Sequence, residues 1–385
     1  MDDDLSYRDI LNKSMFEFLK KIIPGGSQGG HGSSVLGIDI GSSAIKVVQL
    51  RKKDGKAVLE TYGALALGPY AGLEVGQATN LDQLKVAQAL VDIIREAKVT
   101  TKDCAIAIPL SASLVRTVTL PRVTDKELAT MVPIEARKYI PVPIGDVILD
   151  WWVIPNQGFE TENEDEANRV PKVEVLIAAI HNETVEKYKV ISQTAGLVPT
   201  FYEIELFSTV RSVLRREMSP TLVIDIGAGA TKVSLVERGV LKRSHHINRG
   251  SQDITLAIAR SFGVSVKQAE DMKRRYGTLG KKDDDAIREL VELTSEFIFS
   301  QAAQVALAYE RQQNKIIKKA ILTGGGSLLK DVLTDAQAKL EMEVIKGHPF
   351  SVVEAPVFLH DVLTQAGPEF AVAIGLALRK LEELS

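Results

Sequence analysis

The chain has 385 residues, which at roughly 150 residues per domain predicts about two to three domains. Hydrophobic residues make up 45% and charged residues 25%, the proportions of an ordinary globular protein, and this excludes a wholly disordered or fibrous chain. The net charge of −3 offers no basic surface for unaided nucleic-acid binding, and the single cysteine, Cys104, excludes an internal disulfide or a multi-cysteine metal site.

The first residues predict a cytoplasmic protein, because Asp2, Asp3 and Asp4 stand where a signal peptide needs basic residues. No apolar run reaches the roughly 18 residues of a membrane-spanning helix. Residues 5–23 carry apolar side chains at helical spacing and predict one amphipathic helix, followed by a flexible Gly/Ser-rich linker up to residue 34. Two roles stay open for this helix: packing on its own domain, or contact with a membrane surface or a partner.

From residue 35 onward, short β-branched runs alternate with helical patterns, which predicts an α/β layer architecture. A helix is expected over 81–97 and a buried strand over 104–109. Residues 110–172 differ and predict an inserted α+β subdomain that ends in an acidic loop, whose five carboxylates at 160–166 are typical of a solvated turn. The α/β pattern resumes at 173–218 with a strand and then a helix.

A second cycle begins near Ser219. Strands over 219–249 precede a mainly helical block, 250–318, in which the KKDDD run at 281–285 predicts an exposed turn. Strand and helix then alternate again, and an apolar helix over 369–381 closes the pattern.

A self-match is the strongest signal in the chain. IDIGSSAIKV at 38–47 and IDIGAGATKV at 224–233 are identical at seven of ten positions, which predicts two related domains that each begin with a strand, a glycine turn and a second strand. Asp39 and Asp225 are suited to a hydrated Mg²⁺, and the turns after them present backbone N–H groups to phosphate oxygens. Lys46 and Lys232 each follow by seven residues and are candidate phosphate ligands. The alternative is two plain hairpins with solvated lysines.

A third glycine cluster, LTGGGSLL at 322–329, follows an apolar strand and favours a flat or anionic ligand. The patterns GxGxxG and GxxxxGK[ST] are absent, so neither a Rossmann dinucleotide site nor a P-loop explains these glycines.

The motifs DIGSSAIK, DIGAGATK and TGGGSLL, in this order, resemble the two phosphate loops and the adenosine loop of the actin-like ATPase superfamily over residues 35–381. The resemblance implies an α/β fold, a duplicated actin-like ATPase fold with two RNase H-like domains around a nucleotide cleft and an FtsA-type α+β inserted subdomain. It divides the chain into a first domain (35–109, 173–218 and 366–385), the insertion (110–172), a second domain (219–249 and 319–365) and a helical nucleotide-contacting subdomain (250–318).

Within that superfamily, the segment TLPRVTDKELATMVPIEARKYIPVPIGDVILDW at 119–151 and the terminal FAVAIGLALRKL resemble the PilM family of type IV pilus assembly proteins. This implies a cytoplasmic adaptor, peripheral to the inner membrane, that binds the N-terminal cytoplasmic tail of PilN, contacts pilus motor and platform proteins and self-associates into a ring. The partner-binding residues that we expect in the insertion are Leu120, Arg137, Tyr139 and Ile140.

Carried over residue by residue, the resemblance implies ATP or ADP with Mg²⁺ as cofactors. Asp39 and Asp225 would flank the Mg²⁺, mostly through water. The phosphates would lie between Gly41, Ser42, Ser43 and Lys46 on one side and Gly227, Ala228 and Gly229 on the other. On the adenosine side would be Glu270, Lys273 and Arg274 from one helix and Gly324, Gly325, Gly326 and Ser327 from the third loop. An ordinary surface ion pair is the alternative for Glu270 and Lys273.

Hydrolysis depends on Glu205, which the resemblance implies either orients the attacking water or holds a metal-bound water. Lys232 stands where a further acid often sits in the superfamily, so we expect slow or absent hydrolysis. Three other functions stay open: an FtsA-like cell-division or filament protein, a small-molecule kinase of the same superfamily, and a scaffold that binds no nucleotide.

Overall fold

The computed structural model describes residues 34–154, 171–214, 217–278 and 285–383. The expected helix over 5–23, nearly all of its linker, the five carboxylates at 160–166 and all but the last residue of the KKDDD run lie outside these residues. Within the ranges described, no helix is long and apolar enough to cross a membrane.

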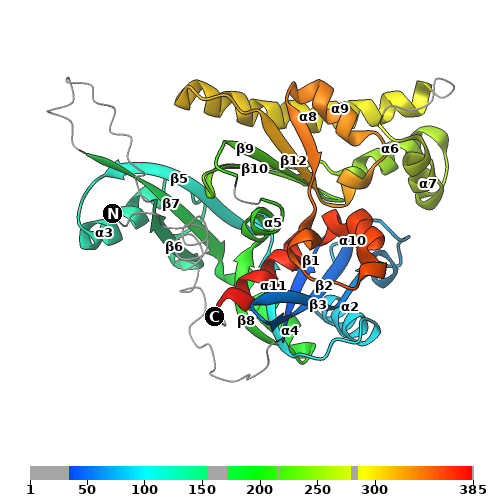
Figure 1. Ribbon diagram of the computed structural model, residues 1–385, viewed down its shortest axis with the longest axis horizontal. Coiled ribbons are helices and arrows are strands. Elements are labelled where there is room, and N and C mark those ends of the chain that lie inside the picture. The colour runs from blue at the N-terminus through cyan, green and yellow to red at the C-terminus, as the bar shows by residue number, and fades with distance from the viewer. Residues whose placement is uncertain (1–33, 155–170, 215–216, 279–284, 384–385) are drawn as a thin grey trace.

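Two five-stranded sheets share one topology. The first has the order β3-β2-β1-β4-β8 and the second the order β11-β10-β9-β12-β13; in each, the first three strands of the order are antiparallel and the last two are parallel to the central strand (Figure 1). The strands are β1 (Ser34–Ile40), β2 (Ala44–Lys53), β3 (Lys56–Ala66), β4 (Asp103–Ile108), β8 (Val198–Ile204), β9 (Thr221–Ile226), β10 (Thr231–Glu237), β11 (Val240–Ile247), β12 (Lys319–Thr323) and β13 (Glu343–Lys346). The sequence repeat is therefore a structural duplication.

Helices cover both faces of the first sheet. They are α2 (Gln83–Glu96), α4 (Asn182–Thr194), α5 (Glu205–Val213) and α11 (Ala371–Glu383). Side chains of β4 alternate, so Ile106 faces the core that contains α2 and α4 while Ala105 packs against α11. Small residues on the α11 side let that helix approach closely, because a Cβ at Gly37 of β1 would lie 1.9 Å from the Ala373 carbonyl oxygen.

The second sheet is covered by α8 (Asp285–Gln313) and α9 (Val332–Leu340), whose apolar side chains pack on β9 and β12. Two further helices, α6 (Ser251–Phe262) and α7 (Val266–Tyr276), pack against the start of α8 and form a separate apolar cluster. In the described part of the expected helical block the structure has these three helices. A further helix is α10 (His360–Ala366), and short 3₁₀ turns are η3 (Gly68–Ala71), η4 (Leu110–Ala112), η5 (Ile144–Asp146), η7 (Gly325–Leu328), η8 (Pro349–Val352), η9 (Val357–Leu359) and η10 (Gly367–Phe370).

A third, antiparallel sheet has the order β5-β7-β6, with strands β5 (Ser113–Pro121), β7 (Lys172–His181) and β6 (Val147–Val153). One face packs on α3 (Asp125–Ala136). Edge strand β5 lies beside edge strand β11 of the second sheet, where the Thr117 hydroxyl donates to the Leu241 carbonyl at 3.1 Å and the Ser244 hydroxyl donates to the Val115 carbonyl at 3.2 Å. The segment between β4 and α4 therefore contacts both five-stranded sheets.

Candidate functional site: a carboxylate-lined cleft between two glycine turns

Two equivalent hairpins meet at the cleft. On the first, Asp39 of β1 stands directly opposite Lys46 of β2; on the second, Asp225 of β9 stands opposite Lys232 of β10. The spacing of seven residues thus produces two cross-strand acid–lysine pairs, with Nζ to carboxylate distances of 4.0 Å for Lys46 and 3.7 Å for Lys232. Both turns close in the same way, because the Gly41 N–H donates to the Ala44 carbonyl at 3.0 Å and the Gly227 N–H donates to the Ala230 carbonyl at 2.9 Å.

The loops approach each other closely. A Cβ at Gly229 would lie 3.2 Å from the Ser42 hydroxyl oxygen of the opposite loop. Gly324 begins the third loop with a φ of +79°, and a Cβ there would lie 2.3 Å from Asp225 Oδ1. Gly229 thus brings the second turn against the first, and Gly324 brings the backbone of the third loop against the Asp225 carboxylate.

A cleft of about 270 Å³ joins these groups, just below the roughly 300–1,000 Å³ typical of ligand sites. The expected site residues that line it are Asp39, Gly41, Ser42, Ser43, Lys46, Glu205, Asp225, Gly227, Ala228, Gly229, Lys232, Gly324 and Gly325. Sequence reasoning missed four polar side chains that also line it, which are Ser111, His246, Asn248 and Glu369. His246 could have been found from the β10–β11 hairpin. Its tight turn at Arg238 and Gly239, where both residues have positive φ, sets the strand register that places His246 opposite Lys232.

Burial shifts the charges in the cleft. It raises the pKa of Asp39 to about 6 although Lys46 acts in the opposite direction, and it also raises the pKa of Asp225. For Lys232, burial alone lowers the pKa, but the carboxylates of Glu205 and Asp225 outweigh this and raise it above its usual value. Three carboxylates thus face two ammonium groups in a low-dielectric space, an arrangement that suits an added cation together with an anionic ligand.

Glu205 is the first residue of α5, and both of its carboxylate oxygens have partners. Oε1 accepts the Leu110 backbone N–H at 2.8 Å, and Oε2 lies 2.9 Å from Lys232 Nζ. The side chain is buried, with 6% of the residue exposed. Glu205 therefore joins the start of the 110–172 segment to the second hairpin.

The donors fit Mg²⁺ with a bound phosphate ligand. No group of three or more His, Cys, Asp or Glu side chains able to hold a metal occurs among the residues that the structure describes. A cation between Asp39 and Asp225 therefore needs oxygens from water and from a ligand, which is how Mg²⁺ is held in phosphate sites. At Gly41, Gly227 and Gly229 of the two turns, no side chain stands between the backbone and a phosphate.

The residues expected on the adenosine side do not all reach this cleft. Lys273 is buried and donates to the Ser251 carbonyl at 3.2 Å and to the Thr255 hydroxyl at 2.9 Å, while Glu270 pairs with Lys273 at 2.7 Å and with Arg274 at 2.9 Å. These three form an ion-pair network within α7, and hydrogen bonds with Ser251 and Thr255 join it to α6.

In the third loop, two expected residues shape the loop and do not line the cleft. Gly326 packs against the Ile226 side chain, 2.2 Å from where its Cβ would be, and the Ser327 hydroxyl donates to the Gly324 carbonyl at 2.7 Å. A direct contact of either residue with adenosine stays a prediction.

Two of the four expected partner residues need correction. Leu120 and Ile140 are 5% and 7% exposed because they pack in the apolar core beneath α3, so neither side chain is accessible to a partner. Arg137 is exposed. Tyr139 is half-buried, with the Arg116 guanidinium 4.1 Å from its ring centroid and its hydroxyl 3.0 Å from Glu135. The two that stay candidates therefore lie where α3 ends.

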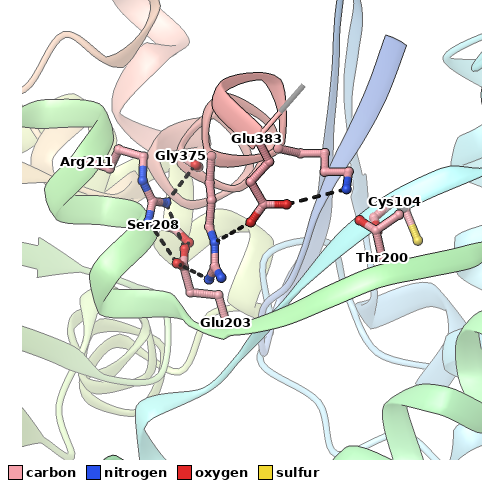
Figure 2. A network of polar contacts seen from close by, with 9 residues as sticks. Cys104, Thr200, Glu203, Ser208, Arg211, Gly375 and Glu383 are labelled. Atoms are coloured by element: carbon pink, nitrogen blue, oxygen red, sulfur yellow. Dashed lines mark hydrogen bonds and ion pairs between the residues drawn. The ribbon is translucent and has the colours of Figure 1, made fainter. Parts of the chain in front are cut away.

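Figure 2 shows a buried ion network around Glu203. Glu203, the residue before the last of β8, is fully buried and accepts two hydrogen bonds at 2.8 Å from Arg211, one at 2.7 Å from Arg379, and one from the Ser208 hydroxyl. Arg211 also donates to the Gly375 carbonyl at 2.8 Å. The network ties β8, α5 and α11 together, and both helices have their first residues, Glu205 and Ala371, in the cleft wall.

Comparison with known proteins identifies a family and several relatives. The sequence profile of the family described as type IV pilus assembly protein PilM matches residues 37–381. Cell division protein FtsA of Neisseria meningitidis serogroup B is 23% identical over 383 residues, covering 90% of each chain.

Among solved structures, a PilM–PilN type IV pilus biogenesis complex is similar with a TM-score of 0.74, 28% identity, and coverage of 90% of this chain and 98% of that one. Two more distant structures share the fold. The ethanolamine utilization protein EutJ of Carboxydothermus hydrogenoformans has a TM-score of 0.51, 14% identity and coverage of 97% and 99% of the two chains. MreB5 of Spiroplasma citri bound to ADP has a TM-score of 0.51, 14% identity and coverage of 91% and 99%. The expected actin-like fold is thereby confirmed.

Proposed function

Because this chain belongs to the family of type IV pilus assembly proteins PilM, we propose that it is a nucleotide-binding adaptor in the assembly of a type IV pilus. The observation that carries the nucleotide part is the convergence of the Asp39–Lys46 and Asp225–Lys232 pairs on one cleft. Family membership favours this role over the cell-division alternative, and no feature of the cleft favours a small-molecule kinase.

Different residues of the cleft would hold different parts of ATP or ADP with Mg²⁺. Bound Mg²⁺ would supply charge neutralisation between phosphate groups. Asp39 and Asp225 would hold this ion, mostly through water, and N–H groups of the two glycine turns would donate hydrogen bonds to phosphate oxygens. Lys46 neutralises phosphate charge from the first half and Lys232 does so from the second. Support also comes from MreB5 of Spiroplasma citri, a protein of similar fold whose structure contains ADP.

Hydrolysis in this account is slow or absent. A residue that activates water must accept its proton, but in the ligand-free protein each oxygen of Glu205 already has a partner, the Leu110 N–H or the Lys232 ammonium, and a water would have to compete with these partners. Bound nucleotide then serves to hold the two halves together rather than to drive turnover. Steady-state phosphate release by the purified protein tests this: we expect release close to the rate without enzyme, and sustained turnover of about 1 per second or faster would refute it.

The partner that we propose is the N-terminal cytoplasmic segment of PilN, which would recruit the chain to the inner membrane. There the chain would contact the platform and motor proteins and would associate with its own copies into a ring. Support comes from the similar PilM–PilN complex. We place the contact near Arg137 and Tyr139, where an exposed guanidinium and a half-buried aromatic ring adjoin the end of α3.

Titration of a labelled PilN N-terminal peptide tests this placement. Arg137→Ala and Tyr139→Ala should each weaken binding by about tenfold, as expected for loss of one interface anchor. Lys126→Ala, at an exposed position of the same helix, is the matched control and should bind like the parent. Parent-like affinity of both variants would exclude the site at the end of α3, and failure of the parent to bind would exclude the partner.

A further inference from the structure

Residues 67–82, which we call the strap, connect β3 to α2 and are fixed to the first half of the molecule. The Tyr70 hydroxyl donates to Asp92 of α2 at 2.7 Å, and the Leu67 N–H donates to the Ser43 carbonyl at 2.9 Å. The Leu73 N–H returns to the Gly68 carbonyl at 2.9 Å, so the first part of the strap folds back on itself. The strap is therefore an ordered structure with its own internal hydrogen bonds.

The strap also reaches the second half at two points. The Ala78 N–H donates to Gln252 Oε1 at 2.6 Å, at the beginning of α6. Glu74 accepts the backbone N–H of Lys267 at 2.7 Å, at the beginning of α7, where a carboxylate satisfies a free helix N–H and interacts favourably with the helix dipole. Separation of the two halves on this side must break both contacts.

Both phosphate turns lie against the same segment. The Thr79 N–H donates to the Ser42 carbonyl of the first turn at 2.8 Å. Ala78 Cβ lies 3.8 Å from where a Cβ on Gly229 of the second turn would stand. The Gln252 N–H in turn donates to the Ala228 carbonyl, so the residue that holds Ala78 is itself bonded to the second turn. A change in the spacing of the turns is thereby transmitted to the strap.

We propose that the strap is a clasp that sets the rate at which nucleotide enters and leaves the cleft. This rests on the proposed nucleotide-binding function and adds its regulation. With the Glu74 and Ala78 contacts made, the halves are held together and bound nucleotide is retained; with both broken, the cleft opens for exchange. Both contacts are single hydrogen bonds, and Glu74 is exposed, so the clasp opens without unfolding of either half.

Nucleotide exchange after mutation tests the proposal. The protein is loaded with a fluorescent ATP analogue in Mg²⁺ and chased with excess unlabelled ATP. Glu74→Ala and Gln252→Ala should each speed release about fivefold, the effect of one lost hydrogen bond. Val75→Ala, an exposed neighbour of Glu74, is the control and should release the analogue at the parent rate.

A crosslink between the strap and the second turn should slow nucleotide release, the opposite of the effect of the two alanine variants. The distance of 3.8 Å between Ala78 Cβ and the position of a Cβ on Gly229 matches the Cβ–Cβ distance of a disulfide. The double variant Ala78→Cys with Gly229→Cys should therefore form a disulfide on oxidation. The natural cysteine, Cys104, is buried and does not compete. Because the oxidised protein is compared with itself after reduction, any effect of the substitutions cancels. Oxidation should stop release and reduction should restore it. Unchanged exchange in both experiments, with normal binding, would overturn the clasp alone; no binding by the parent would overturn the nucleotide site and the clasp with it.

Discussion

Lys232 and Glu205 form an ion pair across the cleft, with Nζ 2.9 Å from Oε2. Lys232 belongs to the second hairpin, whereas Glu205 begins α5 beneath the first sheet and also accepts the Leu110 N–H at 2.8 Å. One carboxylate thus connects the second half to Leu110, the first residue of η4, which lies between β4 and strand β5 of the third sheet. In the absence of ligand this pair neutralises charge that a bound phosphate and cation would otherwise balance.

Breaking that pair should destabilise the ligand-free protein. Lys232→Met leaves two buried carboxylates without their cation and should lower the free energy of unfolding by about 3 kcal/mol, whereas Lys232→Met combined with Glu205→Gln should recover part of the loss. Chemical denaturation of the four proteins in this cycle measures the coupling. Lys189→Ala, which removes an exposed pair with Glu186, is the control and should cost less than about 1 kcal/mol. Additive effects at Lys232 and Glu205 would show that the pair contributes nothing.

The Glu203 network predicts a pH dependence of stability. Burial raises the pKa of Glu203, but Arg211 and Arg379 outweigh this and lower it from its ordinary 4.5 to about 2. Since the folded-state value is below the unfolded one, the contribution is complete above pH 4.5 and is lost as the pH falls toward 2. Denaturation at a series of pH values should show this decline in the parent. Glu203→Gln should be less stable at pH 7 and flatter over that window; an equal slope in both proteins would argue against the network.

Close packing of α11 predicts which glycine is indispensable. A Cβ at Gly375 would lie 1.9 Å from the Ser208 carbonyl oxygen, so Gly375→Ala must push α11 away from α5 and should cost about 3 kcal/mol. Gly145 has no atom within 4 Å of its Cβ position and makes a suitable control, since Gly145→Ala should change stability by less than about 0.5 kcal/mol. Thermal unfolding of the two variants measures the difference. Equal melting temperatures would mean that α11 is not held against α5.

The fold and the geometry of the two glycine turns were predictable from the sequence because both rest on repeated local patterns. Repetition of DIG and the spacing of seven residues place Asp39 beside Lys46 and Asp225 beside Lys232 through strand pairing alone. The pairing of Lys232 with Glu205 depends on how two sheets face each other, and no pattern in either segment records it. The Glu203–Arg379 contact spans 176 residues and was missed for the same reason.

The expected partner-binding residues show a different limit of prediction from sequence. Leu120 and Ile140 have the apolar character of an interface and of a core alike, and only the position of α3 over the third sheet places them in the core. Glu270 and Lys273 have the spacing of a helical ion pair, which the structure contains; a ribose ligand would have to compete with the hydroxyl of Thr255 for both.

Binding of fluorescent ATP with and without Mg²⁺ is the most direct test of the account. We expect saturable binding by the parent that strengthens with Mg²⁺, and a loss of about 10- to 100-fold in Asp225→Ala, because the carboxylate that orients the hydrated metal is removed. Asp361→Ala, an exposed acid on α10, should bind like the parent. Equal binding by the parent and Asp225→Ala, or no binding by the parent, would contradict the assignment of the cleft to a nucleotide.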